Sequence, residues 1–358
     1  MIGMNAQSTD DCGTTSDMQT TSLQHLQNQS QWPSMVDRRT TVNVPIQIHI
    51  IGSTSGAFSI DSFLVFDEIE SVNEHYAEAN INFFMCGPVN NIGSNAHLTF
   101  TKGDEEDLCD IHDVDGAINI YFAPNLENQN GESLCGYAYN YDIKNRVLMD
   151  NGCSTNGSTL SHELGHSFSL LHTHSTSNGR ELADGSNCQT AGDLLCDTPA
   201  DPRLSSDLVN SNCEYTGTDV DSQNNPYNPD PTNIMSYSRK NCRTFFSESQ
   251  LLQMQAFHFA NSQLLTCEND PISNTNNQEN KTEYAISPNP FNTFFTIKKL
   301  NKNDVLTIYS TTGERIKQIE FSDIVYNYQL NCSAFSSGMY MVVISNGQNN
   351  YIEKLIKY

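Results

Sequence analysis

Four histidines and one glutamate lie within the stretch STLSHELGHSFSLLHTH, residues 158–174. His162 and His166 are four residues apart, so on a helix both imidazoles project from one face and can bind one metal ion, with Glu163 beside them. His172 follows six residues after His166 and offers a third imidazole. The spacing predicts a metal site that begins on a helix and is completed by the segment that follows it.

Three neutral imidazoles around Zn²⁺ leave a fourth position for water, and such an open site is typical of catalytic rather than structural zinc. Glu163 lies next to the first of these ligands, where its carboxylate can take a proton from that water. The alternative is a surface helix with incidental histidines. His174 does not fit the spacing and is expected to be a loop residue.

The chain before this stretch predicts a sheet that backs the histidine-bearing helix. VNVPIQIHII alternates and then becomes continuously apolar, as a strand does when it passes from the edge of a core into it. The expected elements are a strand at 43–52, a helix at 59–80, strands at 81–86 and 117–123, and a helix that begins near Thr159. We expect an α/β (or α+β) domain with a twisted sheet, followed by residues 173–232 as mostly loop.

The composition excludes several classes of partner. The 358 residues include 42 Asp and Glu against 18 Lys and Arg, a net charge of −24, which repels phosphate backbones and anionic lipid head groups. Nucleic acids and membrane surfaces are therefore not expected as partners. The sequence contains no apolar run of about 18 residues, so we expect no membrane span.

The acidity belongs to the first domain, which we place at residues 42–267. Residues 268–283 are polar and Asn-rich and are typical of a linker. Residues 284–358 hold 7 Lys and Arg against 5 Asp and Glu, a charge of +2, so the rest of the chain carries −24 − 2 = −26. Short alternating runs such as FFTIKKL and YMVVIS, separated by turn signals, predict a small all-β sandwich in this tail.

Eleven cysteines, none in a CxxC pair, favour disulfides in an oxidising compartment. Residues 1–6 end in Ala6 before Gln7, like the end of a signal peptide, and we expect them to be a remnant of one. Residues 7–41 are polar and predict a pro-segment or flexible leader. An ordinary disordered N-terminus is the alternative.

The pattern HExxHxxxxxH resembles the signature of the metzincin metalloproteases, which continues to a methionine turn beneath the zinc. GDLLCDTPADP (192–202) and NIMSYSRKNCRTFFSESQ (233–250) are similar to the pappalysin, or cytophagalysin, branch, and the resemblance covers about residues 40–265. It implies these roles: zinc ligands His162, His166 and His172, general base and acid Glu163, floor residue Met235, and oxyanion-stabilising Tyr237.

The same resemblance implies structural calcium near Asp193, Asp197 and Thr198, because an acidic loop offers the oxygen ligands that Ca²⁺ prefers. Two positions depart from the family. Ser169 stands where the family usually has Gly, and if this position needs a positive φ, Ser costs on the order of 1 kcal/mol. Ser236 replaces an acidic residue, so the substrate specificity of relatives is not carried over.

Family-like spacing suggests how the cysteines in the loop after the zinc helix pair. We expect Cys188 to pair with Cys213 and Cys196 with Cys242. These bonds would staple the loop to itself and to the methionine-turn region.

The cysteine in the N-terminal segment is a candidate latency switch. Cys12 precedes Gly13, which allows close approach of the backbone to a cleft. A thiolate is a good zinc ligand and would occupy the position that the catalytic water needs. The alternatives are that Cys12 pairs with Cys332 or another cysteine, or has no role in a disordered leader.

The tail resembles the C-terminal sorting domain of the type IX secretion pathway, through SPNPF (287–291), IYSTTGERI, SSGMYMVVISNGQ and KLIKY. A generic adhesive β-sandwich is the alternative. The resemblance implies export to the cell surface or medium, type IX machinery as a partner, and removal or anchoring of the tail. The function we expect is zinc-dependent cleavage of proteins or peptides. The competing hypothesis is a zinc-carrying surface adhesin, which would have no use for Glu163.

Overall fold

The computed structural model describes residues 10–15, 18, 41–58, 60–267, 284–310, 315–345 and 350–358. These residues form two compact units: the first ends at Thr266 and the second consists mainly of Cys267–Tyr358. The expected signal remnant at 1–6, most of the leader at 7–41, and the linker at 268–283 lie outside the described residues.

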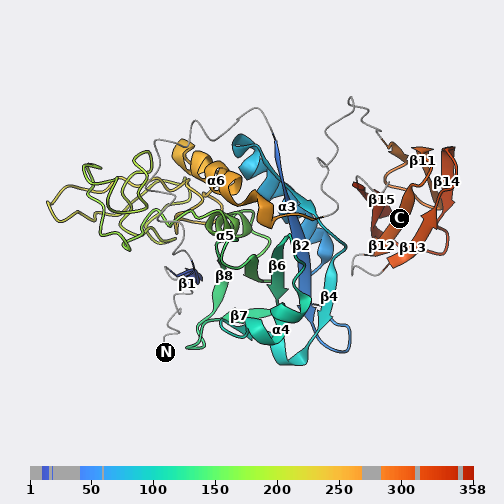
Figure 1. The fold of residues 1–358 in the computed structure, drawn as a ribbon, viewed down its shortest axis with the longest axis horizontal. Coiled ribbons are helices and arrows are strands. Elements are labelled where there is room, and N and C mark those ends of the chain that lie inside the picture. Colours follow the sequence, from blue (N-terminus) through green and yellow to red (C-terminus); the bar gives the residue numbers. More distant parts are fainter. Residues whose placement is uncertain are drawn as a thin grey trace. The chain divides into compact units, whose positions relative to one another are not determined.

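The first unit is built on a seven-stranded sheet with the order β1-β8-β9-β6-β2-β3, in which β4 also pairs with β2 (Figure 1). Its strands are β1 (Asp10–Cys12), β2 (Val42–Gly52), β3 (Ile81–Met85), β4 (Asn90–Gly93), β6 (Ile118–Ala123), β8 (Leu134–Ala138) and β9 (Arg146–Asp150). β2 is parallel to β3, β4 and β6, and β6 is parallel to β9, whereas β8 is antiparallel to β9. The continuous apolar run of β2 is explained by its central place, because a parallel strand between helices is buried on both faces.

Helices cover both faces of this sheet. They are α3 (Ser62–Tyr76), α4 (Glu105–His112), α5 (Thr159–Ser167) and α6 (Glu248–Asn261), with one-turn 3₁₀ helices at Ala77–Ala79, Asn95–His97 and Ser262–Leu264. On one face α3, α5 and α6 share a core with the sheet through Val65, Leu164 and Phe257. On the other face α4 packs together with the short pair β5 (Thr99–Thr101) and β7 (Asn125–Glu127). α5 is thereby held between the sheet and the loops that follow it.

The expected α/β fold is confirmed, with shifted element boundaries. The helix expected at 59–80 spans Ser62–Tyr76, and the chain then turns through Asn80, which has a left-handed φ of 51°. The strand expected at 117–123 is Ile118–Ala123, and the helix expected from Thr159 begins there.

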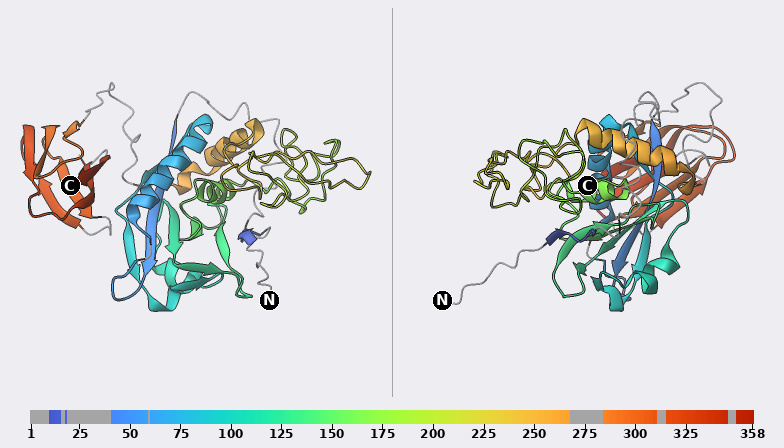
Figure 2. Two further views of the ribbon diagram at one scale, coloured as in Figure 1. Left: turned by 180° about the vertical axis from the view of Figure 1, so that it is seen from behind. Right: turned by 60° about the vertical axis from the view of Figure 1, so that its left-hand side comes forward.

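Loops dominate between α5 and α6, as expected, and extend to one side of the sheet in all views (Figure 2). The expected disulfide partners in this region are wrong. Cys188 pairs with Cys196 and Cys213 with Cys242, at Cα–Cα distances of 5.1 and 5.4 Å.

The reason for the different pairing is local turn geometry. Between Cys188 and Cys196 the backbone passes through positive φ at Gly192 and Leu194 and folds back on itself. Cys213, with a φ of 61°, lies at a turn where its N–H donates to the carbonyl of Asn210. The loop is still stapled both to itself and to the methionine-turn segment. Cys135 and Cys153 form a further disulfide, and the thiols of Cys12, Cys109 and Cys332 are free and buried.

The second unit is the expected small β-sandwich. Its strands are β10 (Ile286–Ser287), β11 (Phe294–Leu300), β12 (Val305–Ser310), β13 (Arg315–Glu320), β14 (Val325–Asn331), β15 (Gly338–Ser345) and β16 (Asn350–Lys357). They form two antiparallel sheets of order β10-β11-β14 and β13-β12-β15-β16. Phe295, Ile308 and Val342 belong to a core of its own. Among the described residues, none of the helices combines the length and apolar character needed to cross a bilayer.

Candidate metal centre and active site

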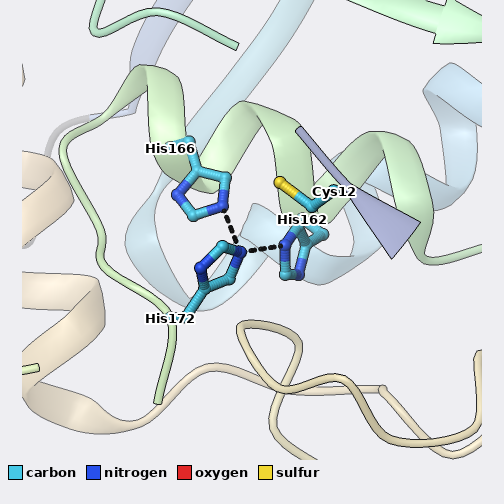
Figure 3. Close-up of side chains that lie close together, drawn as sticks. All are labelled: Cys12, His162, His166 and His172. Carbon is cyan, nitrogen blue, oxygen red and sulfur yellow. Dashed lines mark hydrogen bonds between the residues drawn. The ribbon is translucent and has the colours of Figure 1, made fainter. Parts of the chain in front are cut away.

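The helix α5 places two of the expected ligands one turn apart. His162 and His166 are both buried, and their rings lie edge to face with centroids 4.8 Å apart. The Nε2 atom of His172 lies 3.0 Å from Nε2 of His166 and 3.2 Å from Nε2 of His162. Figure 3 shows the three rings converging, with His172 on the segment that follows the helix.

A tight turn at the end of α5 returns the chain toward its own helix. The N–H of Ser169 donates to the carbonyl of His166, and the N–H of Leu170 donates to that of Gly165, the pair of bonds that defines a Schellman motif. Ser169 occupies the left-handed position of this motif with a φ of 69°. The expected requirement for positive φ at Ser169 is therefore met by a residue with a Cβ.

The second nitrogen of two of the rings is fixed by a backbone carbonyl. Nδ1 of His162 lies 2.7 Å from the carbonyl oxygen of Ile234, and Nδ1 of His166 lies 2.7 Å from that of Leu170. A carbonyl only accepts, so Nδ1 carries the proton and Nε2 presents its lone pair to the centre. Burial also lowers the pKa of all three imidazoles, that of His166 to about 4, so the rings are neutral.

Met235 forms the floor beneath α5. It is fully buried, and a Cβ on Gly165 would lie 2.5 Å from its Sδ atom, so the helix can approach Met235 only with glycine at this place. The carbonyl of Met235 accepts the N–H of Thr173, directly after His172. The methionine turn thus supports both the helix and the third imidazole.

Tyr237 lies beside the ligands. Its ring centroid is 4.8 Å from that of His172 and 6.0 Å from that of His162. Its hydroxyl donates to the carbonyl of Cys12 at 3.1 Å, and the Arg203 guanidinium lies 5.4 Å from its ring centroid.

Glu163 is completely buried on the side of α5 that faces β8. A Cβ on Gly136 would lie 2.8 Å from Cγ of Glu163, so glycine at this place in β8 makes room for the carboxylate. Oε2 of Glu163 is 3.4 Å from both the Sγ atom of Cys12 and the hydroxyl of Thr14.

The N-terminal strand β1 pairs with β8 and carries Cys12 to the imidazoles, and we refer to the place that β1 occupies beside β8 as the groove. β1 is parallel to β8, with Asp10 opposite Leu134 and Cys12 opposite Gly136. Cys12, His162, His166 and His172 each offer one ligand atom, and these four atoms lie within 4.8 Å of one another (Figure 3).

The donor set fits a metal ion. Three neutral Nε2 lone pairs that face one another at 3.0–3.2 Å repel unless a cation or a shared proton lies between them. Three imidazoles and one thiolate match the tetrahedral N₃S preference of Zn²⁺.

Comparisons with known proteins agree with this geometry. Residues 138–260 match the model of the pregnancy-associated plasma protein-A family of peptidases, and residues 285–358 match that of the secretion system C-terminal sorting domain. The chain is a metalloprotease whose residues 138–260 resemble the pappalysin family. It ends in a secretion sorting domain, so it is a secreted or cell-surface protein.

Two curated relatives are fungal extracellular metalloproteases. The one from Arthroderma benhamiae is 26% identical over 249 residues, covering 62% of this chain and 74% of the relative. The one from Neurospora crassa is 27% identical over 250 residues, covering 61% and 75%. The solved structure of a Tannerella forsythia promirolysin mutant has a TM-score of 0.50 at 17% identity and covers 70% of this chain and 94% of its own, which shows the same fold.

The structure brings only part of the expected calcium set together. Both carboxylate oxygens of Asp193 accept the hydroxyl of Thr198 at 2.9 Å. Asp197 instead accepts the hydroxyl of Ser247 and the N–H of Ser249 at the start of α6. Asp197 therefore bonds to the start of α6 and not to Asp193 or Thr198.

Glu181 and His174 were not found from the sequence. Glu181 is 5% exposed, and burial raises its pKa to about 7. The pKa of Asp193 is raised first by burial and further by the nearby Glu181 carboxylate. Gly192 next to Asp193 leaves room for the Glu181 carboxylate, since a Cβ there would lie 2.4 Å from Oε2. His174 stacks on His172 with centroids 4.8 Å apart, so it supports the site although it lies in a loop. No spacing rule relates these residues to the signature.

Proposed function

We propose that this pappalysin-type protease binds Zn²⁺ through His162, His166 and His172 and cleaves peptide bonds with Glu163 as general base and acid. The observation that carries the proposal is the convergence of three Nε2 lone pairs, two of them fixed by carbonyls at Nδ1, beside a buried carboxylate. Zinc, when bound, lowers the pKa of a water molecule to about 7 and polarises a carbonyl oxygen.

The chain's own residues carry the proton. Glu163 accepts the proton of the attacking water on a carboxylate oxygen and passes it to the leaving amine nitrogen, so the carboxylate is regenerated after each turnover. The buried position of Glu163 excludes bulk water from this transfer. Tyr237, whose hydroxyl reaches the carbonyl of Cys12, is placed to donate to the oxyanion of a substrate carbonyl that takes the same position.

We also propose that Cys12 keeps the enzyme latent by offering its sulfur as a fourth ligand. The thiol lies within reach of all three imidazoles, and β1 fills the groove along β8. Contacts on both sides hold the segment: the Lys102 ammonium donates to the carbonyl of Gly13 at 2.6 Å, and Thr14 bonds with the backbone of Ala138. Neither a substrate nor a catalytic water has room until this segment leaves.

A structural calcium ion held by Asp193 and Glu181 belongs to the same proposal. Two nearly fully buried carboxylates, one of which raises the pKa of the other, are stabilised by a divalent cation, and oxygen donors suit Ca²⁺. The ion would order a loop that has little core of its own. The substrates are proteins or peptides, and the type IX secretion machinery is the partner of the sorting domain.

The test is Glu163→Gln in a Cys12→Ala background, which frees the groove. We expect the variant to keep one zinc per chain, measured by mass spectrometry of metals, while hydrolysis of denatured protein falls by roughly 10²–10⁴-fold or more. Glu68→Gln, another buried glutamate, is the matched control and should retain activity. Cleavage at the parental rate by the Glu163→Gln chain would exclude the mechanism and favour the adhesin hypothesis.

A further inference from the structure

Several of the few basic residues of this acidic protease lie near β1 and the metal centre. Of the 18 Lys and Arg, 7 lie in residues 284–358, which leaves 18 − 7 = 11 for the rest of the chain. Two of these 11 contact β1 or a residue beside the ligands: Lys102 donates to the carbonyl of Gly13, and the Arg203 guanidinium lies over the ring of Tyr237. The buried Arg243 donates to the carbonyl of Ser236, next to Tyr237. A further basic residue, Lys240, contacts Cys135 of β8.

The direction of a substrate in the groove follows from β1. An extended peptide adds to the edge of β8 that β1 occupies. β1 runs parallel to β8. In this direction the side chain of Cys12, and not a peptide bond to be cleaved, lies at the imidazoles. We take the substrate to run the other way, antiparallel to β8, which is also the more stable ladder. Its residues after the scissile bond then lie toward Leu134 and Cys135.

Lys240 lies at that end of the groove. Its ammonium is 2.8 Å from Sγ of Cys135, the neighbour of Gly136, and 3.6 Å from Sγ of Cys153. Its carbonyl accepts the hydroxyl of Ser158, the N-cap residue of α5, so the backbone is held against the helix that carries Glu163. The charge of Lys240 acts to lower the pKa of Asp150, a carboxylate that also accepts the backbone N–H groups of Leu126 and Gly152.

The segment that occupies the groove has an acidic sequence. β1 has the sequence DDC, and the register places the backbone of Asp10 opposite Leu134, at the Lys240 end. The protein's own occupant of this stretch of the groove is thus acidic, although an acidic domain would repel such a peptide at long range.

We propose that Lys240 is a specificity-determining residue and that the protease prefers an acidic side chain, Asp or Glu, directly after the scissile bond. The inference rests on the proposed roles of the metal centre, since these fix where the scissile bond lies. A half-buried ammonium discriminates a carboxylate from its neutral amide because only the carboxylate makes a charge-assisted hydrogen bond.

The experiment compares kcat/KM for quenched peptides that differ only in the residue after the scissile bond: Glu, Gln, Lys or Leu. In the Cys12→Ala chain we expect Glu to exceed Gln by about tenfold or more, as charged hydrogen bonds allow. Lys240→Arg should keep this ratio, Lys240→Met should bring it close to one, and Lys240→Glu should invert it in favour of Lys. The ratio should also fall with added salt.

Lys144→Met is the matched control, because Lys144 lies over the ring of Tyr139 and not in the groove, and it should leave the ratio unchanged. Equal rates for Glu and Gln in the parent, or a Glu preference that survives Lys240→Glu, would overturn the proposal while leaving the proposed function intact. A parent chain that cleaves none of the peptides or denatured proteins would overturn both. A purely structural role of Lys240 would lower all rates together and would not invert the preference.

Discussion

At the scale of single residues, the metal centre depends on partners that the signature does not contain. The sequence predicts the three histidines and Glu163 because their spacing on a helix is fixed by 3.6 residues per turn. The carbonyl of Ile234, which fixes the tautomer of His162, and Gly136, which leaves room for Glu163, come from other parts of the fold. Only the tertiary structure brings them together, so no local pattern could predict them.

Glu68 provides a pH-dependent test at this scale. It is 5% exposed, one oxygen accepts the N–H of Gly157 at 3.2 Å, and burial raises its pKa from 4.5 to about 7. Because the folded pKa lies above the unfolded one, the folded state binds the proton more tightly, and stability falls as pH rises from about 4.5 through about 7.

We expect Glu68→Gln to remove this loss. The variant should match the wild type near pH 4.5 and exceed it at pH 8 by on the order of 1–3 kcal/mol, since one pKa unit is about 1.4 kcal/mol. Urea unfolding at the two pH values measures the difference. A wild-type advantage that grows with pH would show that the carboxylate is stabilised in the folded state.

At the scale of elements, the turn after α5 determines whether the third histidine reaches the site. The family pattern predicts a left-handed residue at position 169, and Ser169 adopts it. Ser169 also makes a contact with α6. Its hydroxyl and its backbone carbonyl accept hydrogen bonds from Nε2 of Gln253, at 3.2 and 2.7 Å. This contact ties the turn to the neighbouring helix.

Two substitutions separate these effects. Ser169→Ala and Ser169→Gly both lose the hydroxyl, but only Ala retains a Cβ at positive φ. The Gly variant should therefore be more stable than the Ala variant by about 1 kcal/mol. Thermal unfolding measures this, and an Ala variant as stable as the Gly variant would mean that the turn carries no strain.

Other elements were beyond prediction from the sequence for physical reasons. β8 and β9 have five residues each, too few to show a period, and they are strands because they pair with each other and because β9 also pairs with β6. β1 is a three-residue strand in a polar segment and exists because β8 offers it an edge. The cysteine pairs were wrong because positive-φ turns at Gly192 and Cys213, which spacing does not reveal, decide which sulfurs meet.

At the scale of the whole molecule, a turn-rich segment between α5 and α6 must be kept in shape by bonds other than a hydrophobic core. Two disulfides, Cys188–Cys196 and Cys213–Cys242, constrain this segment, and in our proposal a calcium ion at Asp193 and Glu181 adds to them. A ligand that binds only the folded state raises the melting temperature, by roughly 2–4 °C per kcal/mol for a domain of this size.

We expect a calcium-specific chelator to lower the melting temperature by several degrees and added Ca²⁺ to restore it. Glu181→Gln should abolish the response, whereas Glu214→Gln, a carboxylate bonded to Asn210 elsewhere in the loop, should preserve it. The loop proposal fails if the melting temperature of the wild type does not depend on calcium.

The proposed mechanism and its latency depend on the metal centre and its fourth donor. X-ray absorption at the zinc edge of the full-length chain measures both directly. We predict three nitrogen neighbours at about 2.0–2.1 Å and one sulfur at about 2.3 Å, with the sulfur lost in Cys12→Ala while one zinc per chain remains. A zinc shell without sulfur in the full-length protein would contradict the latency mechanism, and a chain that binds no zinc through these histidines would contradict the account.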